Sequence, residues 1–165
     1  MAISNGPALI LSLMFTAVFT VILCIISISD IRTKKITDPM VLALLPLVVI
    51  SAFLYPGITL VSRVLSLFTA ALPMFVVTVI RPNAFGGGDI KLMAAVGLIL
   101  GWKHTLLAFI IASLIAIIYS LIILIIKKAT IKDTVAFGPA LCIGSLSAFI
   151  AGDLIIAKTL MLYSN

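Results

Sequence analysis

The sequence predicts an all-α membrane protein whose single domain, residues 1–165, crosses the bilayer six times. Of the 165 residues, 64% are hydrophobic and only 10% are charged, and the mean hydropathy is +1.41. A water-soluble domain of this composition would lack the polar residues needed to cover its surface. Six apolar runs separated by short polar segments match helices that cross, or nearly cross, about 30 Å of hydrocarbon.

The first apolar run has no basic segment before it and is longer than the apolar part of a signal peptide, so we expect a retained anchor. The second and fourth runs are short. The second run begins at Asp38 and Pro39, which suit the N-cap and first turn of a helix, and this role is enough to explain Asp38. Pro46 and Pro73 are expected to kink the second and third runs. The six expected spans are residues 8–29, 40–54, 58–80, 89–100, 105–126 and 137–157.

The basic residues predict the orientation. Lysine and arginine in excess mark cytoplasmic loops, so the side with more of them is expected inside and both termini outside, in the inner (plasma) membrane. The same clustering beside apolar runs accounts for the net charge of +6, and no nucleic-acid partner is expected. Trp102 and Tyr55 are expected at the outer interface. Eight basic residues fall on one side (Arg32, Lys34, Lys35, Arg81, Lys91, Lys127, Lys128 and Lys132) and three on the other (Arg63, Lys103 and Lys158).

The positions of the cysteines and glycines indicate helix packing rather than metal binding or catalysis. Cys24 and Cys142 lie in separate apolar runs without the spacing of a zinc site, so both are expected to be packing residues. No metal ion or cofactor is expected. Small residues four apart let membrane helices pack closely. They occur in the fourth span at Gly97 and Gly101, and in the sixth at Gly144, Ala148 and Gly152.

All five acidic residues are aspartates, and two of them are expected at the same cytoplasmic end. Asp30 ends the first span and Asp89 begins the fourth. A helix from Asp89 to His104 rises only about 22 Å, which is less than the thickness of the hydrocarbon layer, about 30 Å. If His104 lies at the outer interface, Asp89 should therefore lie within the membrane, short of the cytoplasmic interface. An ionisable group is costly there (about 2.5–3.5 kcal/mol at the midplane) and needs a partner. Asp30 is the expected partner. We assign Asp133 to a helix cap or to solvent, and Asp153 to an ion pair with Lys158.

Two carboxyl groups in a low-dielectric pocket share a proton, so that one can activate water while the other polarises a carbonyl, as in aspartic proteases. The glycines at 86, 87 and 88 would let an extended peptide lie beside Asp89, although a flexible turn with an interfacial Asp is the alternative interpretation. Helix dipoles favour an anion at Asp89 and a proton on Asp30. His104 lies at the other end, and Gly144-Ser145 is better explained by packing than as part of a serine protease.

These residues resemble the type IV prepilin peptidases, and the resemblance covers nearly the whole chain. The glycines before Asp89 are similar to that family's GxGD signature, and Asp30 matches its aspartate at the end of the first span. Thr37 departs from the family, which often has proline there. The other matching positions are Lys91 after the signature, the basic loop leading through Ile36 to Asp38, and Phe137-Gly138-Pro139 at the start of the last helix.

The resemblance implies an aspartic endopeptidase that acts at the cytoplasmic face. Its implied substrate is a prepilin or pseudopilin, with a short basic leader that is cut before the hydrophobic helix. Asp30 and Asp89 would be catalytic, while the three glycines, Lys91 and Phe137-Gly138-Pro139 would bind substrate or shape the site. Bifunctional members carry a four-cysteine zinc motif associated with N-methylation. This sequence lacks that motif, so it looks like the short, single-function type of tight-adherence (Flp) pilus systems.

Two rival classes remain open on the sequence. In a small helical transporter or channel, Asp30 and Asp89 would bind a proton or a cation near the inner interface. No inverted repeat is evident between the two halves of the chain, although many transporters have one. A catalytically silent membrane scaffold would leave the cost of burying Asp89 unexplained. The sequence leaves the oligomeric state open.

Overall fold

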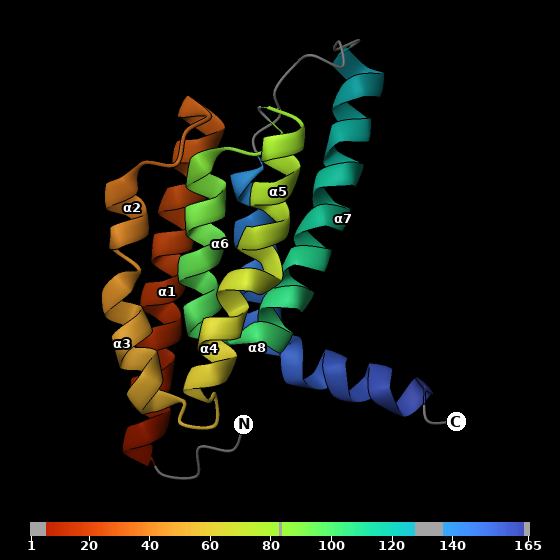
Figure 1. Cartoon of the computed structure of the whole chain (residues 1–165). Coiled ribbons are helices and arrows are strands. Elements are labelled where there is room, and N and C mark those ends of the chain that lie inside the picture. The colour runs from red at the N-terminus through yellow and green to blue at the C-terminus, as the bar shows by residue number, and fades with distance from the viewer. Residues whose placement is uncertain (1–5, 83, 128–136, 164–165) are drawn as a thin grey trace.

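The computed structural model describes residues 6–82, 84–127 and 137–163, and all regular structure in these ranges is helical. The prediction of an all-α fold is confirmed. The elements are α1 (Gly6–Thr33), α2 (Asp38–Leu42), α3 (Leu45–Leu54), α4 (Leu60–Ser66), the π-helical turn η1 (Leu67–Ala71), α5 (Leu72–Ile80), α6 (Gly87–Leu100), α7 (Trp102–Lys127) and α8 (Gly138–Tyr163). The helices form one bundle in which the chain runs up and down (Figure 1).

Among the described residues, four segments are long and apolar enough to cross a membrane: Leu9–Thr33, Leu60–Ile80, Trp102–Ile123 and Gly138–Ile156. The remaining two are the short spans that the sequence predicts. They are the apolar segment Asp38–Leu54, formed by α2 and α3, and the 14-residue helix α6. All six predicted spans therefore correspond to helical segments of a multi-pass membrane protein.

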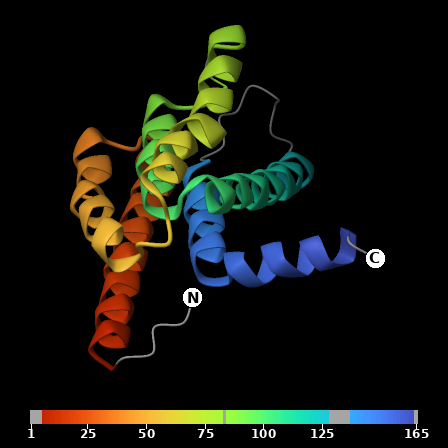
Figure 2. The same cartoon turned by 60° about the horizontal axis from the view of Figure 1, so that its bottom comes forward.

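Two helices extend beyond their predicted ends. α1 runs on to Thr33, so that Asp30 lies within its last turn rather than after it. α8 continues to Tyr163, and its last part turns away from the bundle (Figures 1 and 2). Hydropathy finds where a segment stops being apolar, whereas a helix ends where its backbone hydrogen bonds end. The polar residues after Ser29 therefore looked like a loop in the sequence but continue the helix.

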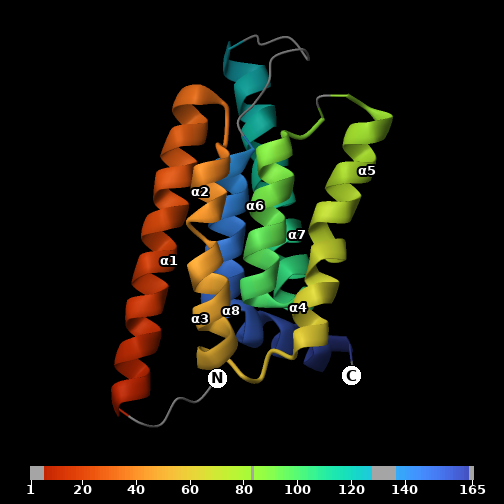
Figure 3. The ribbon, with the colours of Figure 1, turned by 60° about the vertical axis from the view of Figure 1, so that its left-hand side comes forward.

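The shortest of the predicted spans is the centre of the bundle. α6 packs against α3, α4, α7 and α8, and Figure 3 shows it between the α2–α3 pair and α5. Leu92, Met93, Val96 and Ile99 on this helix are all fully buried. Gly97 allows α4 to come close, because a Cβ at this position would lie 2.9 Å from Ser66 Oγ. Burial of α6 explains how it can be stable with so few residues.

Both predicted kinks are confirmed. The second span breaks between α2 and α3, and Pro46 follows four residues after Leu42, where α2 ends. The third span passes through η1, whose residue Thr69 lies four before Pro73. In each case the proline ring removes the hydrogen bond to the carbonyl four residues earlier and crowds that carbonyl. The α-helical ladder therefore breaks one turn before each proline.

Small residues pack α7 against α8 as predicted. A Cβ on Gly144 would lie 2.4 Å from the carbonyl oxygen of Ala108 and 3.0 Å from the Cβ of Ala112. Ala148 is fully buried, and Gly152 lies against the ring of His104. The spacing of small residues thus correctly identified the face along which these two helices touch.

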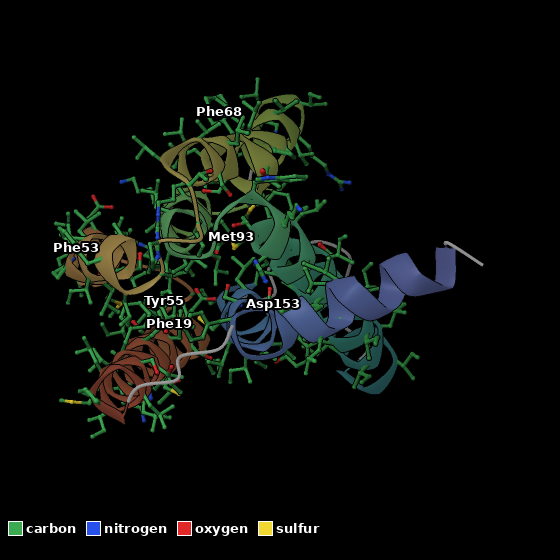
Figure 4. The ribbon with its side chains drawn as sticks, turned by 90° about the horizontal axis from the view of Figure 1, so that it is seen from below. Phe19, Phe53, Tyr55, Phe68, Met93 and Asp153 are labelled. Carbon is green, nitrogen blue, oxygen red and sulfur yellow. The ribbon has the colours of Figure 1, made fainter. Side chains whose placement is uncertain are left out.

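Two side chains face in directions that the sequence did not indicate. Tyr55, just after α3, points into the bundle: it is 5% exposed and packs edge-on against Phe15 and Phe149, with ring centroids 5.6 and 5.9 Å apart. In Figure 4 its side chain points between the helices near Phe19, whereas Phe53 and Phe68 lie on the outside. Cys24 is exposed on α1, so of the two cysteines only Cys142 is a core residue. Hydropathy gives no information on which way a helical residue faces.

Arg63 differs most from its predicted role. The sequence counted this residue, near the start of the predicted span 58–80, among the charges of the outer side, whereas in the structure it lies in α4 with a side chain buried between helices and only 4% exposed. One guanidinium nitrogen donates to Ser51 Oγ (2.7 Å) and to the carbonyl of Leu98 (2.6 Å), and the other donates to the carbonyl of Ser51 (2.9 Å). It thereby joins the C-terminal ends of α3 and α6, where carbonyls lack helical partners and the dipole favours a cation.

We expect Arg63→Met to lower the free energy of unfolding by about 3 kcal/mol, because it leaves several buried carbonyls without a donor. Arg63→Lys should recover only part of this, since one ammonium group cannot reach both helix ends. Thermal unfolding of the purified protein in detergent measures the effect. Arg81→Met, at an exposed arginine after α5, is the matched control. Equal unfolding temperatures for the two Met variants would contradict the proposed bridging role.

Candidate active site

Asp30 and Asp89 lie at the same end of the bundle, the upper end in Figure 1, where α1 ends and α6 begins. Asp30 is 5% exposed and Asp89 is 9% exposed. Their carboxyl groups are close enough to interact electrostatically. The structure therefore brings together the two aspartates that the sequence paired. We call Asp30 and Asp89 the dyad and this end of the bundle the dyad end.

Asp89 is held by the start of its own helix. It is the third residue of α6, and its Oδ2 accepts a hydrogen bond of 3.1 Å from the backbone N–H of Gly86, the residue before the helix. Its other oxygen, Oδ1, is buried without a hydrogen-bond partner among the described residues. A buried carboxylate oxygen without a donor is unusual. This oxygen can accept a hydrogen bond from a water molecule or a bound substrate.

Asp30 is held by a different helix. Its Oδ2 accepts a buried hydrogen bond of 2.8 Å from the backbone N–H of Gly138, the first residue of α8. Position 138 has no room for a side chain, since a Cβ there would lie 2.6 Å from that oxygen. The rings of Phe137 and Phe85 lie 5.2 Å apart and join the segments that lead into α8 and α6. The Phe-Gly-Pro segment therefore contacts the dyad directly.

This contact changes the dipole argument made from the sequence. Asp30 lies near the C-terminal end of α1, where an anion is disfavoured, but it also lies at the N-terminal end of α8, where an anion is favoured. Each carboxyl group of the dyad thus accepts an N–H from the start of a helix. The assumption that only Asp89 has such a setting is wrong. The position of the shared proton stays a prediction.

The three glycines before Asp89 are the N-cap and first turn of α6 rather than a flexible loop. Gly86 precedes the helix, and no described residue beyond the adjoining backbone has an atom within 4 Å of the position that a Cβ on Gly87 would occupy. Gly88 is different, because its Cβ would lie 2.5 Å from the carbonyl oxygen of Ile36. The backbone between α1 and α2 therefore lies directly against the residue before Asp89.

Asp38 does not cap a helix as predicted. Thr37 is the N-cap of α2 and Asp38 is the first helical residue. The Oδ1 of Asp38 lies 2.6 Å from Lys91 Nζ, and both side chains are more than half exposed. This ion pair links α2 to α6 across 53 residues of sequence. Sequence reasoning placed Lys91 at the site, but it did not find this partner.

The remaining polar candidates lie elsewhere. His104 Nε2 is 3.1 Å from Asp153 Oδ1 at the opposite end of the bundle, beside a cavity of about 250 Å³ that is also lined by Tyr55 and Phe149. Ser145 donates to the carbonyl of Leu141, so it forms no serine-protease arrangement with His104. The predicted partner of Asp153, Lys158, and the predicted cap Asp133 lie outside the side chains that the structure describes.

The side chains described at the dyad end include carboxyl groups but do not form a metal-binding cluster. Within the described ranges, no group of three or more His, Cys, Asp or Glu side chains could hold a metal ion. Two buried carboxyl groups at one end of the bundle, one of them with an oxygen that has no hydrogen-bond partner among the described residues, form an arrangement suited to acid–base chemistry on water.

Three known proteins that are similar to this chain have the same name. A prepilin leader peptidase/N-methyltransferase of Bacillus subtilis (strain 168) is 29% identical over 147 residues, covering 89% of this chain and 59% of that protein. The Escherichia coli (strain K12) protein of that name is 33% identical over 126 residues, covering 73% and 56%. In Legionella pneumophila the identity is 42% over 71 residues, covering 43% and 25%.

The chain thus spans less than two thirds of the length of these relatives. No solved structure matches it. The model of the type IV leader peptidase family matches residues 17–121, a range that includes both dyad residues and the glycines of α6. This chain belongs to the type IV leader peptidase family.

Proposed function

We propose that this protein is an aspartic endopeptidase in which Asp30 and Asp89 together activate water. The observation that carries the proposal is the buried dyad, whose two carboxyl groups interact while Asp89 Oδ1 has no hydrogen-bond partner among the described residues. Burial of two coupled carboxyl groups favours a state with one shared proton. A dyad in that state supplies one base and one acid.

The proposed reaction follows from the shared proton. The ionised carboxylate takes a proton from water as the water oxygen attacks the carbonyl carbon of the peptide bond, and the protonated carboxyl donates a hydrogen bond to the carbonyl oxygen. When the resulting intermediate breaks down, the carbon–nitrogen bond is cleaved, and the carboxyl group that took the proton from water gives it to the leaving nitrogen, which returns the dyad to its starting state. The N–H groups of Gly86 and Gly138 hold the two carboxyl groups in place during these steps.

The substrate we propose is a prepilin or pseudopilin with a short basic leader, cut just before its hydrophobic helix. The relatives named prepilin leader peptidase/N-methyltransferase support this class of substrate. We also propose that the dyad end faces the cytoplasm and that both termini lie outside. Three basic residues of the described chain, Arg32, Lys35 and Lys91, are exposed at the dyad end. This supports the proposed orientation, because cytoplasmic loops carry an excess of lysine and arginine.

The deciding experiment is cleavage of a synthetic prepilin peptide, containing the leader and the first part of the hydrophobic helix, by the purified protein in detergent. Mass spectrometry should show a single cut before the helix, and the Asp89→Asn protein should give no product. Proton or cation uptake into liposomes tests the rival transporter function. Uptake that depends on Asp89, together with an intact peptide, would overturn the peptidase proposal.

A further inference from the structure

We propose that residues 34–38, here called the strap, fix the distance between the two carboxyl groups of the dyad, and that the ion pair between Asp38 and Lys91 holds the strap in place. This inference rests on the proposed function, because it concerns the geometry of the same reaction. Asp38 and Lys91 are then positioning residues that act through the strap.

The path of the chain shows how the strap connects Asp30 to the surroundings of Asp89. The strap begins just after α1, where the N–H of Lys34 donates to the carbonyl of Asp30 at 2.8 Å. Lys34 has a positive φ of 53°, which reverses the chain direction and carries it toward α6. Four residues later Asp38 pairs with Lys91, which lies two residues after Asp89. The strap therefore runs from one dyad residue to the immediate neighbourhood of the other.

The middle of the strap rests on α6. The carbonyl oxygen and the Cβ of Ile36 would lie 2.5 and 2.7 Å from a Cβ on Gly88, so the two backbones are in direct contact. The side chain of Ile36 is partly buried against the hydrophobic core. A displacement of the strap would therefore be transmitted to the residue next to Asp89.

The ion pair is suited to positioning more than to stabilising the fold. Both side chains are largely exposed, at 57% for Lys91 and 67% for Asp38, and exposed pairs contribute little to stability. Reaction rates, in contrast, depend steeply on placement, and a misplacement of about 1 Å can cost on the order of 100-fold. Breaking the pair should therefore lower the rate while leaving the protein folded.

Reversing the charges tests this directly. We expect Asp38→Lys and Lys91→Asp each to lower kcat for leader cleavage by about 10- to 100-fold, with KM and the unfolding temperature nearly unchanged. The double variant, which restores an opposite pair, should return to within about threefold of wild type. Asp153→Asn, which neutralises an exposed aspartate at the opposite end, is the control and should keep the wild-type kcat. A double variant no faster than the singles, or a change confined to KM, overturns the proposal.

A second readout does not depend on peptidase activity. Ile36→Cys in a Cys24→Ser, Cys142→Ala background reports strap position through its rate of reaction with a maleimide. The partly buried position should react slowly when the pair is intact or swapped, and at least about 10-fold faster with Lys91→Asp alone. Equal rates in all three proteins overturn the strap. If wild type cleaves no peptide, the proposed function fails and these labelling rates decide the strap by themselves.

Discussion

Replacing either Asp30 or Asp89 by Asn is expected to lower leader cleavage by at least about 1,000-fold, while the protein still folds and inserts into the membrane. The chemistry needs one carboxyl group as a base and the other as an acid, and an amide can serve as neither. The fold should survive, because an Asn side-chain oxygen can still accept the N–H of Gly138 at position 30 or of Gly86 at position 89. Rates are measured with the prepilin peptide, and folding is measured from the unfolding temperature in detergent.

Asp153→Asn is the matched control for this prediction. It removes an aspartate that is 62% exposed at the opposite end and pairs with His104, so cleavage should stay within about twofold of wild type. Cleavage by Asp30→Asn or Asp89→Asn at a rate near that of wild type would rule out the dyad as the catalytic group. A similar loss in all three variants would indicate a general effect of changing charge.

Gly88→Ala is expected to lower cleavage by about 100-fold, whereas Gly87→Ala should keep nearly all activity. Both positions lie in the first turn of α6, where Ala would favour the helix over Gly. At position 88, however, the new Cβ would lie 2.5 Å from the carbonyl oxygen of Ile36, so the strap must move away from α6. At position 87 the added methyl group meets no atom of the described residues within 4 Å, apart from the adjoining backbone of its own helix.

Comparing Gly88→Ala with Gly87→Ala shows whether the glycines are needed for close backbone contact or for flexibility. If the glycines served only as a flexible loop, both substitutions would slow the reaction by a similar factor. The strap contact predicts a large difference between them, measured as kcat with the same peptide. Wild-type activity in Gly88→Ala would mean that the backbone of Ile36 can retreat without disturbing Asp89, and the strap would then have no role in positioning.

Some features of this molecule could be predicted from sequence because they depend on the composition of single segments and not on contacts between helices. The six spans follow from runs of apolar residues, including the short run that became α6. The breaks before Pro46 and Pro73 follow from the missing N–H and the bulk of the proline ring. Placement of Asp30 and Asp89 at one end follows from counting the spans between them. Each of these inferences needs only the order of residues and the thickness of a bilayer.

The helical membrane fold and the pairing of the two aspartates at one end thus follow from the order of the residues. The groups that hold the two aspartates in place come from contacts between helices, which the order of residues does not reveal. The N–H of Gly138 reaches Asp30 across 108 residues, Lys91 reaches Asp38 across 53, and Arg63 reaches the carbonyl of Leu98 across 35. Such contacts depend on the rotation and tilt of each helix, which neighbouring helices set by packing. Because hydropathy is nearly the same around a lipid-embedded helix, it cannot specify that rotation, and for this reason it did not indicate the burial of Arg63 and Tyr55.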